Sequence, residues 1–179
     1  MVTKVNGNST STFGGNIDVT GNSTSTFGGN VDVTGNVITD APAFSVYGSV
    51  ATSATNGTWT KLVADNELWD TNSCYDTTNY RFTPNVEGYY LLSAHFYMGN
   101  TTGGRVSRVM KNSVTEVLRG MIGVGVASIG SDSSVNGLVY ANGTTDYFEY
   151  YIYQSSGSTI STNNASQLTY FSGFLARAA

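Results

Sequence analysis

The first forty residues of the chain are dominated by an internal repeat of fourteen residues. Residues 7–20 read GNSTSTFGGNIDVT, residues 21–34 repeat them with Val31 in place of Ile17, and a third copy begins at residue 35. Gly-Asn pairs recur within each copy, and such pairs mark turns. Between the turns lie Ser-Thr-Ser-Thr-Phe and a short β-branched segment, which favour strands. Each repeat therefore predicts two short strands joined by turns.

The repeat carries too few apolar side chains to form a core within one chain. Ordering a residue costs about 1–2 kcal/mol of conformational entropy, and each copy offers only three apolar groups against that cost. Repeat units bury their apolar faces against neighbours, and other copies of the same chain would supply them. We therefore predict an intertwined β-stem, with a flexible low-complexity linker as the alternative. The stem positions expected to be buried between chains are Phe13, Ile17, Phe27 and Val31.

A change of composition at Pro42 marks the start of a second domain, which covers residues 41–179. Trp, Tyr and Leu appear there, the repeat ends, and short apolar segments alternate with turn residues. No segment longer than ten residues has a convincing helical period, and the apolar segment 121–126 is interrupted by glycines, which suits a strand. This pattern predicts an all-β sandwich or jelly roll.

Charge and side-chain counts exclude several classes of protein. The net charge of −4 leaves no basic face for nucleic acid, and no apolar run approaches the ~18 residues of a membrane span. The first four residues are not followed by an apolar stretch, which predicts that no secretory signal is present. Cys74 and His95 are the only residues of their types, so most metal sites and catalytic triads are excluded. We accordingly expect no enzymatic activity, no cofactor and no metal ion.

Two predicted strands carry apolar side chains on both faces. In residues 89–98 one face is wholly apolar and the other half apolar, and in residues 147–153 aromatic side chains occupy both faces. In a two-layer sandwich only one face of a sheet packs on the core, and a solvated face should be polar. The second face is therefore expected to be covered by another subunit. The head residues placed in this interface are His95, Tyr97, Tyr147, Tyr151 and Tyr153.

Several segments of the second domain resemble C1q-like domains in order and spacing. The matching segments are the opening strand AFS (43–45), FTPNVEGYY (82–90), MKN (110–112), VYANG (139–143) and the closing strand YFSGFL (170–175). Residues 82–90 are similar to that family's aromatic-Thr-Pro start followed by Gly-Tyr-Tyr. Ser113 departs from the pattern, because glycine is common after the Lys-Asn pair of the mid-domain hairpin.

The resemblance implies a ten-stranded C1q/TNF-like jelly roll that assembles as a compact homotrimer. It also implies that both two-faced strands belong to the inner sheet, near the threefold axis. Residues 7–40 depart from animal C1q relatives because they contain no Gly-X-Y collagen stalk. They resemble instead the trimeric β-stems of bacteriophage fibres. The predicted organisation is an attachment segment at residues 1–6, a β-stem at 7–40 and a jelly-roll head at 41–179.

His95 and Cys74 each have a functional and a structural interpretation. Three copies of His95 beside a threefold axis would bind an ion or respond to pH, whereas the alternative is a hydrogen-bonded interface histidine. Cys74 has no activating base at useful spacing, which favours a buried or tolerated thiol over a nucleophile.

Basic and aromatic residues provide a candidate ligand surface. The basic residues between 105 and 119 fit either an acidic glycan or a charged strand edge that prevents aggregation. The two tryptophans and Tyr75 either stack on sugar rings or pack in the core. Asp65, Asp70 and Asp76 fall in one stretch, but their spacing matches no calcium-binding loop motif. The residues of the candidate ligand surface are Trp59, Trp69, Arg105, Arg108 and Lys111.

Together these features predict a structural protein of a bacteriophage virion, assembled in the host cytoplasm. The leading hypothesis is a homotrimeric fibre or spike whose N-terminus binds another virion protein and whose head faces outward, towards a host-surface glycan. The second hypothesis is a capsid decoration protein, because residues 1–40 reach at most about 130 Å even when extended. A bacterial adhesin would need an export signal, and a glycan hydrolase would need acid–base residues, which are sparse here.

Overall fold

The computed structural model describes residues 41–99, 102–122 and 130–179. Every regular element in these ranges is a β-strand, as the composition predicted. Within the same ranges no helix is long and apolar enough to cross a membrane. The chain divides into two units between residues 38 and 39. The predicted attachment segment and β-stem lie outside the described residues, as do the stem positions Phe13, Ile17, Phe27 and Val31.

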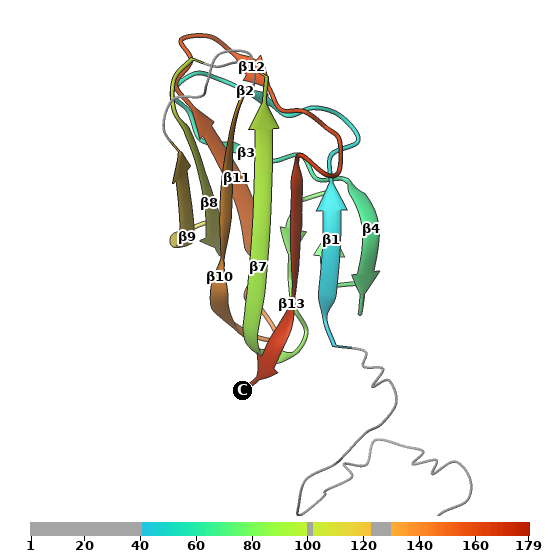
Figure 1. Ribbon diagram of the computed structural model, residues 1–179. Helices are drawn as coiled ribbons and strands as arrows, with labels where there is room; N and C mark the ends of the chain where they lie inside the picture. The colour runs from blue at the N-terminus through green and yellow to red at the C-terminus, as the bar shows by residue number, and fades with distance from the viewer. Residues whose placement is uncertain (1–40, 100–101, 123–129) are drawn as a thin grey trace, which may run out of the picture. The chain divides into compact units, whose positions relative to one another are not determined.

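Two antiparallel sheets form the head and face each other as layers (Figure 1). The first sheet has five strands in the order β10-β7-β13-β1-β4, with bounds Ser131–Asn142 (β10), Glu87–Met98 (β7), Tyr170–Ala178 (β13), Ala43–Tyr47 (β1) and Asn66–Thr71 (β4). The second sheet has the order β5-β6-β11-β8-β9, and β3 is also paired to β11. The bounds of its strands are Tyr75–Asp76 (β5), Arg81–Phe82 (β6), Phe148–Gln154 (β11), Arg105–Lys111 (β8), Thr115–Ile122 (β9) and Thr60–Lys61 (β3).

A short pair of strands completes the described part of the head. Its members are β2 (Ser53–Ala54) and β12 (Ile160–Ser161). Thirteen strands are present among the described residues instead of the ten that the resemblance implied. The count is higher because five of them contain only two residues and are formed by loop segments. The all-β jelly-roll architecture predicted from the turn-rich, alternating sequence is confirmed.

The core between the two sheets is built from the alternating strands. In β7 the even-numbered side chains from Tyr90 to Met98 are buried, and the odd-numbered side chains face outward. Burying one large apolar side chain contributes about 1.5–3 kcal/mol. Aromatic rings join the layers, because Phe44 of β1 stacks on Phe82 of β6 with centroids 4.2 Å apart, and Phe171 of β13 meets Phe44 edge-on at 4.9 Å.

The Lys-Asn hairpin expected at residues 110–112 is present between β8 and β9. Asn112 and Ser113 have φ angles of 55° and 57°, and the N–H of Val114 donates to the carbonyl of Lys111 at 3.1 Å. Positive φ at both central residues is the geometry of a type I′ turn, whose twist matches that of the flanking strands. Ser113 adopts it although glycine would do so with less strain.

The chain enters and leaves the head at the same end. β1 and β13 are antiparallel neighbours, and the N–H of Leu175 donates to the carbonyl of Pro42 at 3.0 Å. The loops that follow β1 and β11, together with β2 and β12, lie at the opposite end of the sandwich (Figure 1).

The two strands with apolar side chains on both faces lie in different sheets. β7 belongs to the five-stranded sheet, whereas β11 is in the second sheet between β8 and β6. The prediction that both strands belong to one inner sheet is therefore wrong. It failed because strand pairing depends on contacts between residues distant in sequence, such as Tyr150 with Val109, which the local pattern does not encode.

Candidate assembly face and opposite polar network

The outward face of the five-stranded sheet carries a contiguous group of large apolar side chains. Strand pairing places Leu138 of β10 opposite Leu91 of β7, and Leu91 opposite Phe174 of β13. Next to this row Tyr140 is paired with Tyr89, and their rings meet edge-on at 5.6 Å. Leu138 is 61% exposed and Phe174 48%. We call these five residues the assembly band, because contiguous exposed apolar groups mark interaction surfaces.

His95 and Tyr97 lie on the same face, nearer the opposite end of β7. The His95 ring is engaged within its own chain, with Nδ1 2.6 Å from the carbonyl oxygen of Leu168, Nε2 3.0 Å from Oδ2 of Asp132, and a stacked contact with Tyr170. These contacts tie β7 to β10 and to the loop before β13. They favour the structural interpretation of His95, and its place in a subunit interface stays a prediction.

The outward face of β11 is covered by cationic and aromatic side chains of the same chain. Arg108 and Lys61 lie 5.4 and 6.0 Å from the ring centroid of Tyr151. Trp59 packs 5.4 Å from Tyr153 and has the Arg108 guanidinium 4.0 Å above its ring. Cation–π contacts contribute about 0.5–2 kcal/mol each. The aromatic side chains on this face therefore have partners within the chain, and their role between subunits is a prediction that competes with the assembly band.

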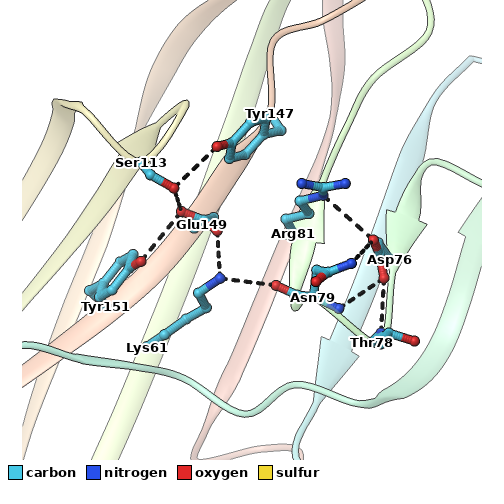
Figure 2. A network of polar contacts seen from close by, with 9 residues as sticks. All are labelled: Lys61, Asp76, Thr78, Asn79, Arg81, Ser113, Tyr147, Glu149 and Tyr151. Atoms are coloured by element: carbon cyan, nitrogen blue, oxygen red, sulfur yellow. Dashed lines mark hydrogen bonds and ion pairs between the residues drawn. The ribbon is translucent and has the colours of Figure 1, made fainter.

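A polar network lies at the centre of this face (Figure 2). The Glu149 side chain is 3% exposed, and its carboxylate accepts from Nζ of Lys61 at 2.5 Å and from the Ser113 hydroxyl at 2.7 Å. The Tyr151 hydroxyl donates to it at 3.4 Å, and Lys61 also donates to the carbonyl of Asn79 at 3.1 Å. Burying a carboxylate is costly unless it is paired and hydrogen-bonded. The network thereby fastens β3 and the β8–β9 turn to β11.

Asp76 closes the turn beside this network (Figure 2). Its carboxylate accepts from the N–H groups of Thr78 and Asn79 at 3.0 and 2.9 Å and from the Asn79 side chain at 2.7 Å, and Arg81 lies 3.5 Å away. These hydrogen bonds, led by that of the Asn79 side chain, lower the pKa of Asp76. Arg81 also lies over the ring of Tyr147 at 5.0 Å. The turn before β6 is thereby tied to the start of β11.

The residues of the candidate ligand surface are not brought together. Arg105 is fully buried and donates to two loop carbonyls at 3.0 and 3.1 Å, so its prediction as a surface residue is wrong. The reason is its position in β8, where residues 105, 107 and 109 face inward. Trp59 and Arg108 do meet, on the outward face of the second sheet. Trp69 lies instead on β4 of the first sheet, 48% exposed.

The exposed basic side chains of β8 and β9 have acidic partners within the chain. Lys111 lies 2.7 Å from Asp146, and Glu116 pairs with Arg119 at 2.5 Å and with Arg108 at 3.6 Å. The hydrogen bond from Arg119, helped by the charges of both guanidinium groups, lowers the pKa of Glu116. An acidic glycan would have to compete with these carboxylates. The pairing favours the alternative interpretation, a charged strand surface that resists aggregation.

The three aspartates considered for a cation act separately. Asp65 accepts from the N–H and hydroxyl of Ser49 at 2.6 and 2.7 Å, and Asp70 accepts from the N–H groups of Cys74 and Tyr75 at 3.1 and 2.9 Å. Hydrogen bonding from the Ser49 side chain lowers the pKa of Asp65. Within the described ranges no group of three or more His, Cys, Asp or Glu is arranged to hold a metal ion. The three carboxylates therefore fasten turns.

Cys74 and Tyr75 belong to the core. The Cys74 side chain is 5% exposed, and burial, together with the charge of Asp70, raises the pKa of its thiol. A raised pKa leaves little of the nucleophilic thiolate. Tyr75 stacks on Phe44 with centroids 5.3 Å apart, so it is not available for stacking on a sugar ring. The structural interpretation holds for both residues.

No member of the assembly band was among the interface residues predicted from the sequence. The alternation of β10 carries a signal, because Val135 and Val139 are buried while Leu138 and Tyr140 point outward. Phe174 is an outward residue of β13 and is paired with Leu91 of β7 and Ala43 of β1. Which outward residues lie side by side depends on strand order, and that order is a property of the tertiary structure.

No protein-family model and no curated protein sequence matches this chain. Solved structures do match. Murine APRIL at pH 5.0 has a TM-score of 0.59 at 11% identity, covering 75% of this chain and 98% of its own. The globular domain of zebrafish complement 1qA has a TM-score of 0.57 at 17% identity, and the match covers 78% of this chain and 99% of that domain. Eiger TNF from S. frugiperda has a TM-score of 0.56 at 9% identity, and the match covers 78% of this chain and 95% of its own. At these identities the similarity establishes the fold alone: the head is a C1q/TNF-like jelly roll.

Proposed function

We propose that this chain is a non-enzymatic structural protein that forms a homotrimer through the assembly band. The observation that carries the proposal is the row Leu138–Leu91–Phe174 with Tyr140 and Tyr89 beside it, which is apolar, contiguous over three strands and largely exposed. Leaving such a group in water is unfavourable by about 25 cal/mol per Å² of apolar surface. The resemblance of residues 82–90 to C1q-like domains implies the same assembly.

Two faces of the head compete for the role of subunit interface. On the outward face of β11, Tyr151 and Tyr153 are half-buried under Arg108 and Trp59 of their own chain. On the assembly band Lys111 lies 5.4 Å from the Tyr140 ring centroid, whereas Leu138 is 61% exposed. Covering the row Leu138–Leu91–Phe174 displaces fewer cation–π contacts than covering β11, so the band is the better interface.

The proposed role is a fibre or spike of a bacteriophage virion. Support comes from the resemblance of the fourteen-residue repeat to trimeric phage stems and from the C1q/TNF-like fold of the head. In this role residues 1–6 bind another virion protein, and the head is turned away from the particle. A capsid decoration protein is the second candidate, which the shortness of the repeat region favours, since residues 1–40 reach at most about 130 Å even when extended.

Sedimentation of the full chain at equilibrium tests the assembly. The expected mass is three times 19.0 kDa. Leu138→Asp places a charge in the middle of the band and should yield monomers, because an unpaired charge is costly to bury. Tyr151→Ala should leave the trimer mass unchanged, and Val114→Asp, at the exposed tip of the β8–β9 turn, is the matched control. A folded wild-type monomer contradicts the proposal, and dissociation by Tyr151→Ala alone would move the interface to the second sheet.

Electron microscopy of intact particles tests the biological role. Antibodies against the head, carrying gold labels, should mark the ends of tail or head appendages if the protein is a fibre. Regular labelling over the shell would identify the decoration role instead. Particles without label, purified from a host that produces the protein, would contradict both assignments.

A further inference from the structure

The end of the head opposite the chain's entry includes two segments that carry no charged side chain, and the Asp65 carboxylate binds Ser49 at the edge of the first segment (Figure 1). We call residues 48–58 and 154–169 the polar cap. Neither segment contains Asp, Glu, Lys, Arg or His. Six of the eleven residues in the first and twelve of the sixteen in the second are Ser, Thr, Asn or Gln. Charged residues normally make up about a quarter of a protein, so an uncharged surface of this size requires an explanation.

The two segments of the polar cap are joined by hydrogen bonds although they are about a hundred residues apart in sequence. The side-chain amide of Gln154 donates to the carbonyl of Ala54 at 3.0 Å, and Asn56 accepts from the N–H of Gly157 at 2.7 Å. The Thr52 N–H donates to the side chain of Thr162 at 2.9 Å. β2 and β12 add a short ladder between the same segments. These contacts hold the hydroxyl and amide groups in one arrangement, and such preorganisation lowers the entropy lost on binding a ligand.

The polar cap remains accessible when the assembly band is covered. Along β7 the band residue Leu91 lies four residues from His95, which contacts the cap residue Leu168, and this corresponds to roughly 13 Å. The cap also lies at the end of the sandwich away from Pro42, where the chain enters (Figure 1). Trp59 and Tyr153 stand at its border, next to Gly57. No enclosed pocket forms among the described residues, so a ligand would be held on an open surface.

We infer that the polar cap binds a neutral, hydroxyl-rich carbohydrate. Gln154, Thr52 and Thr162 are buried and hold the cap together, whereas exposed cap hydroxyls such as those of Thr55, Thr58 and Thr159 face solvent. A hydroxyl is both a donor and an acceptor, which matches the hydroxyl groups of an uncharged sugar. A charged ligand would find no ion-pair partner within either segment. This inference rests on the proposed function, in which the entry end is turned towards the particle and the cap towards the host.

Binding of the full-chain protein to immobilised oligosaccharides tests the inference. The panel contains neutral glucose, mannose, galactose and N-acetylglucosamine oligomers beside sialylated and sulfated ones. Binding is expected on neutral members only. Since no ion pairs contribute, it should be unchanged between about 0.1 M and about 1 M NaCl. Thr58→Glu and Thr159→Glu, both at exposed cap positions, should weaken it at least about tenfold, because the new carboxylate disturbs the uncharged surface.

Thr144→Glu is the matched control, since Thr144 is an exposed threonine in the loop between β10 and β11 at the entry end. It should bind as the wild type does. The inference is overturned if no neutral member binds, if only acidic members bind and salt releases them, or if Thr144→Glu is impaired as much as the cap variants. Sedimentation of the same samples separates the two proposals. A trimer that binds no neutral sugar rejects the inference alone, whereas a monomer rejects the proposed function.

Discussion

Gly120 decides how closely the two sheets approach at one side of the sandwich. It lies in β9 of the second sheet, beside β10 of the first, and a Cβ atom at this position would overlap the carbonyl oxygen of Ser134. A Cβ atom on Gly137 would meet only the end of the Leu118 side chain, which can move. Gly120 is therefore needed because it lacks a side chain, and not for a special φ angle. A single residue thus allows the sheets to close where β9 and β10 meet.

Gly120→Ala should destabilise the head by about 1–3 kcal/mol, because backbone atoms of β10 must shift to make room for the methyl group. Urea unfolding followed by tryptophan fluorescence measures the change. Gly99→Ala is the control, since a Cβ there meets no heavy atom within 4 Å. If Gly120→Ala and Gly99→Ala are equally stable, β9 and β10 are further apart than they are in this structure.

At the scale of elements, side-chain carboxylates and amides hold the loops to the strands. In the loop between β10 and β11, Oδ1 of Asn142 accepts from the N–H groups of Thr144, Thr145 and Asp146, each at 3.0 Å. Asp146 in turn accepts from the N–H of Asn142 at 2.9 Å and from Nζ of Lys111 at 2.7 Å. Such local hydrogen bonds replace the missing strand partners in a turn. The loop is thus fixed to the β8–β9 hairpin through one carboxylate.

The Asp146 carboxylate should make the head sensitive to acid. Burial opposes its ionisation, but hydrogen bonds from Lys111, Asn112 and the Asn142 N–H outweigh burial and lower its pKa. A carboxyl whose folded pKa lies below its unfolded value of about 4 stabilises the fold above that value, and the stabilisation is lost as the pH falls through the folded pKa. The wild type should therefore lose stability below about pH 4. Asp146→Asn should cost about 1–3 kcal/mol at pH 7.

Unfolding by urea at a series of pH values between about 2.5 and 7 checks this prediction. The difference between wild type and Asp146→Asn should shrink as the pH falls, because the protonated wild-type carboxyl then resembles the amide. Asp65→Asn is a useful comparison, since Asp65 also has a lowered pKa but lies in another loop. A difference for Asp146→Asn that stays constant over the whole range would contradict the assigned hydrogen bonds.

At the scale of the whole molecule, the head separates three surfaces with different chemistry. The assembly band is apolar and lies towards the entry end of the first sheet. The outward face of the second sheet is an aromatic and cationic layer with its charges paired, and the polar cap carries no charge. Because the assembly band and the polar cap lie towards opposite ends of the head (Figure 1), assembly and recognition would operate independently.

Core and interface truncations should differ in their dependence on concentration. Phe96 is fully buried within one head, and Phe96→Ala should destabilise the fold by about 3–5 kcal/mol and reduce soluble yield. Phe174→Ala removes an exposed ring of the assembly band. It should leave the fold of each head intact while making the melting temperature depend strongly on protein concentration, as expected for a weakened oligomer. Differential scanning calorimetry over a hundredfold range of concentration distinguishes the two. If Phe174→Ala keeps the trimer mass and its melting temperature does not depend on concentration, the assembly band is not the subunit interface.

The amino-acid sequence alone was sufficient for the class of fold and for the inward face of the strand at residues 89–98. Such properties depend on residues that are close in sequence. Examples are the alternation of buried and outward side chains from Tyr90 to Met98 and the Lys-Asn turn that includes Ser113. The pattern could also show that residues 147–153 are apolar on both sides. What it could not show was which residues cover the second side.

The tertiary structure alone decided the sheet to which each strand belongs and the surroundings of each outward side chain. Tyr151 is covered by Arg108 because β8 pairs with β11, and Arg105 is buried because its register in β8 faces the core. Leu138 and Phe174 lie on one surface only because β7 stands between their strands. Strand order and register are set by the total free energy of packing all strands together, and no local segment of the sequence contains that information.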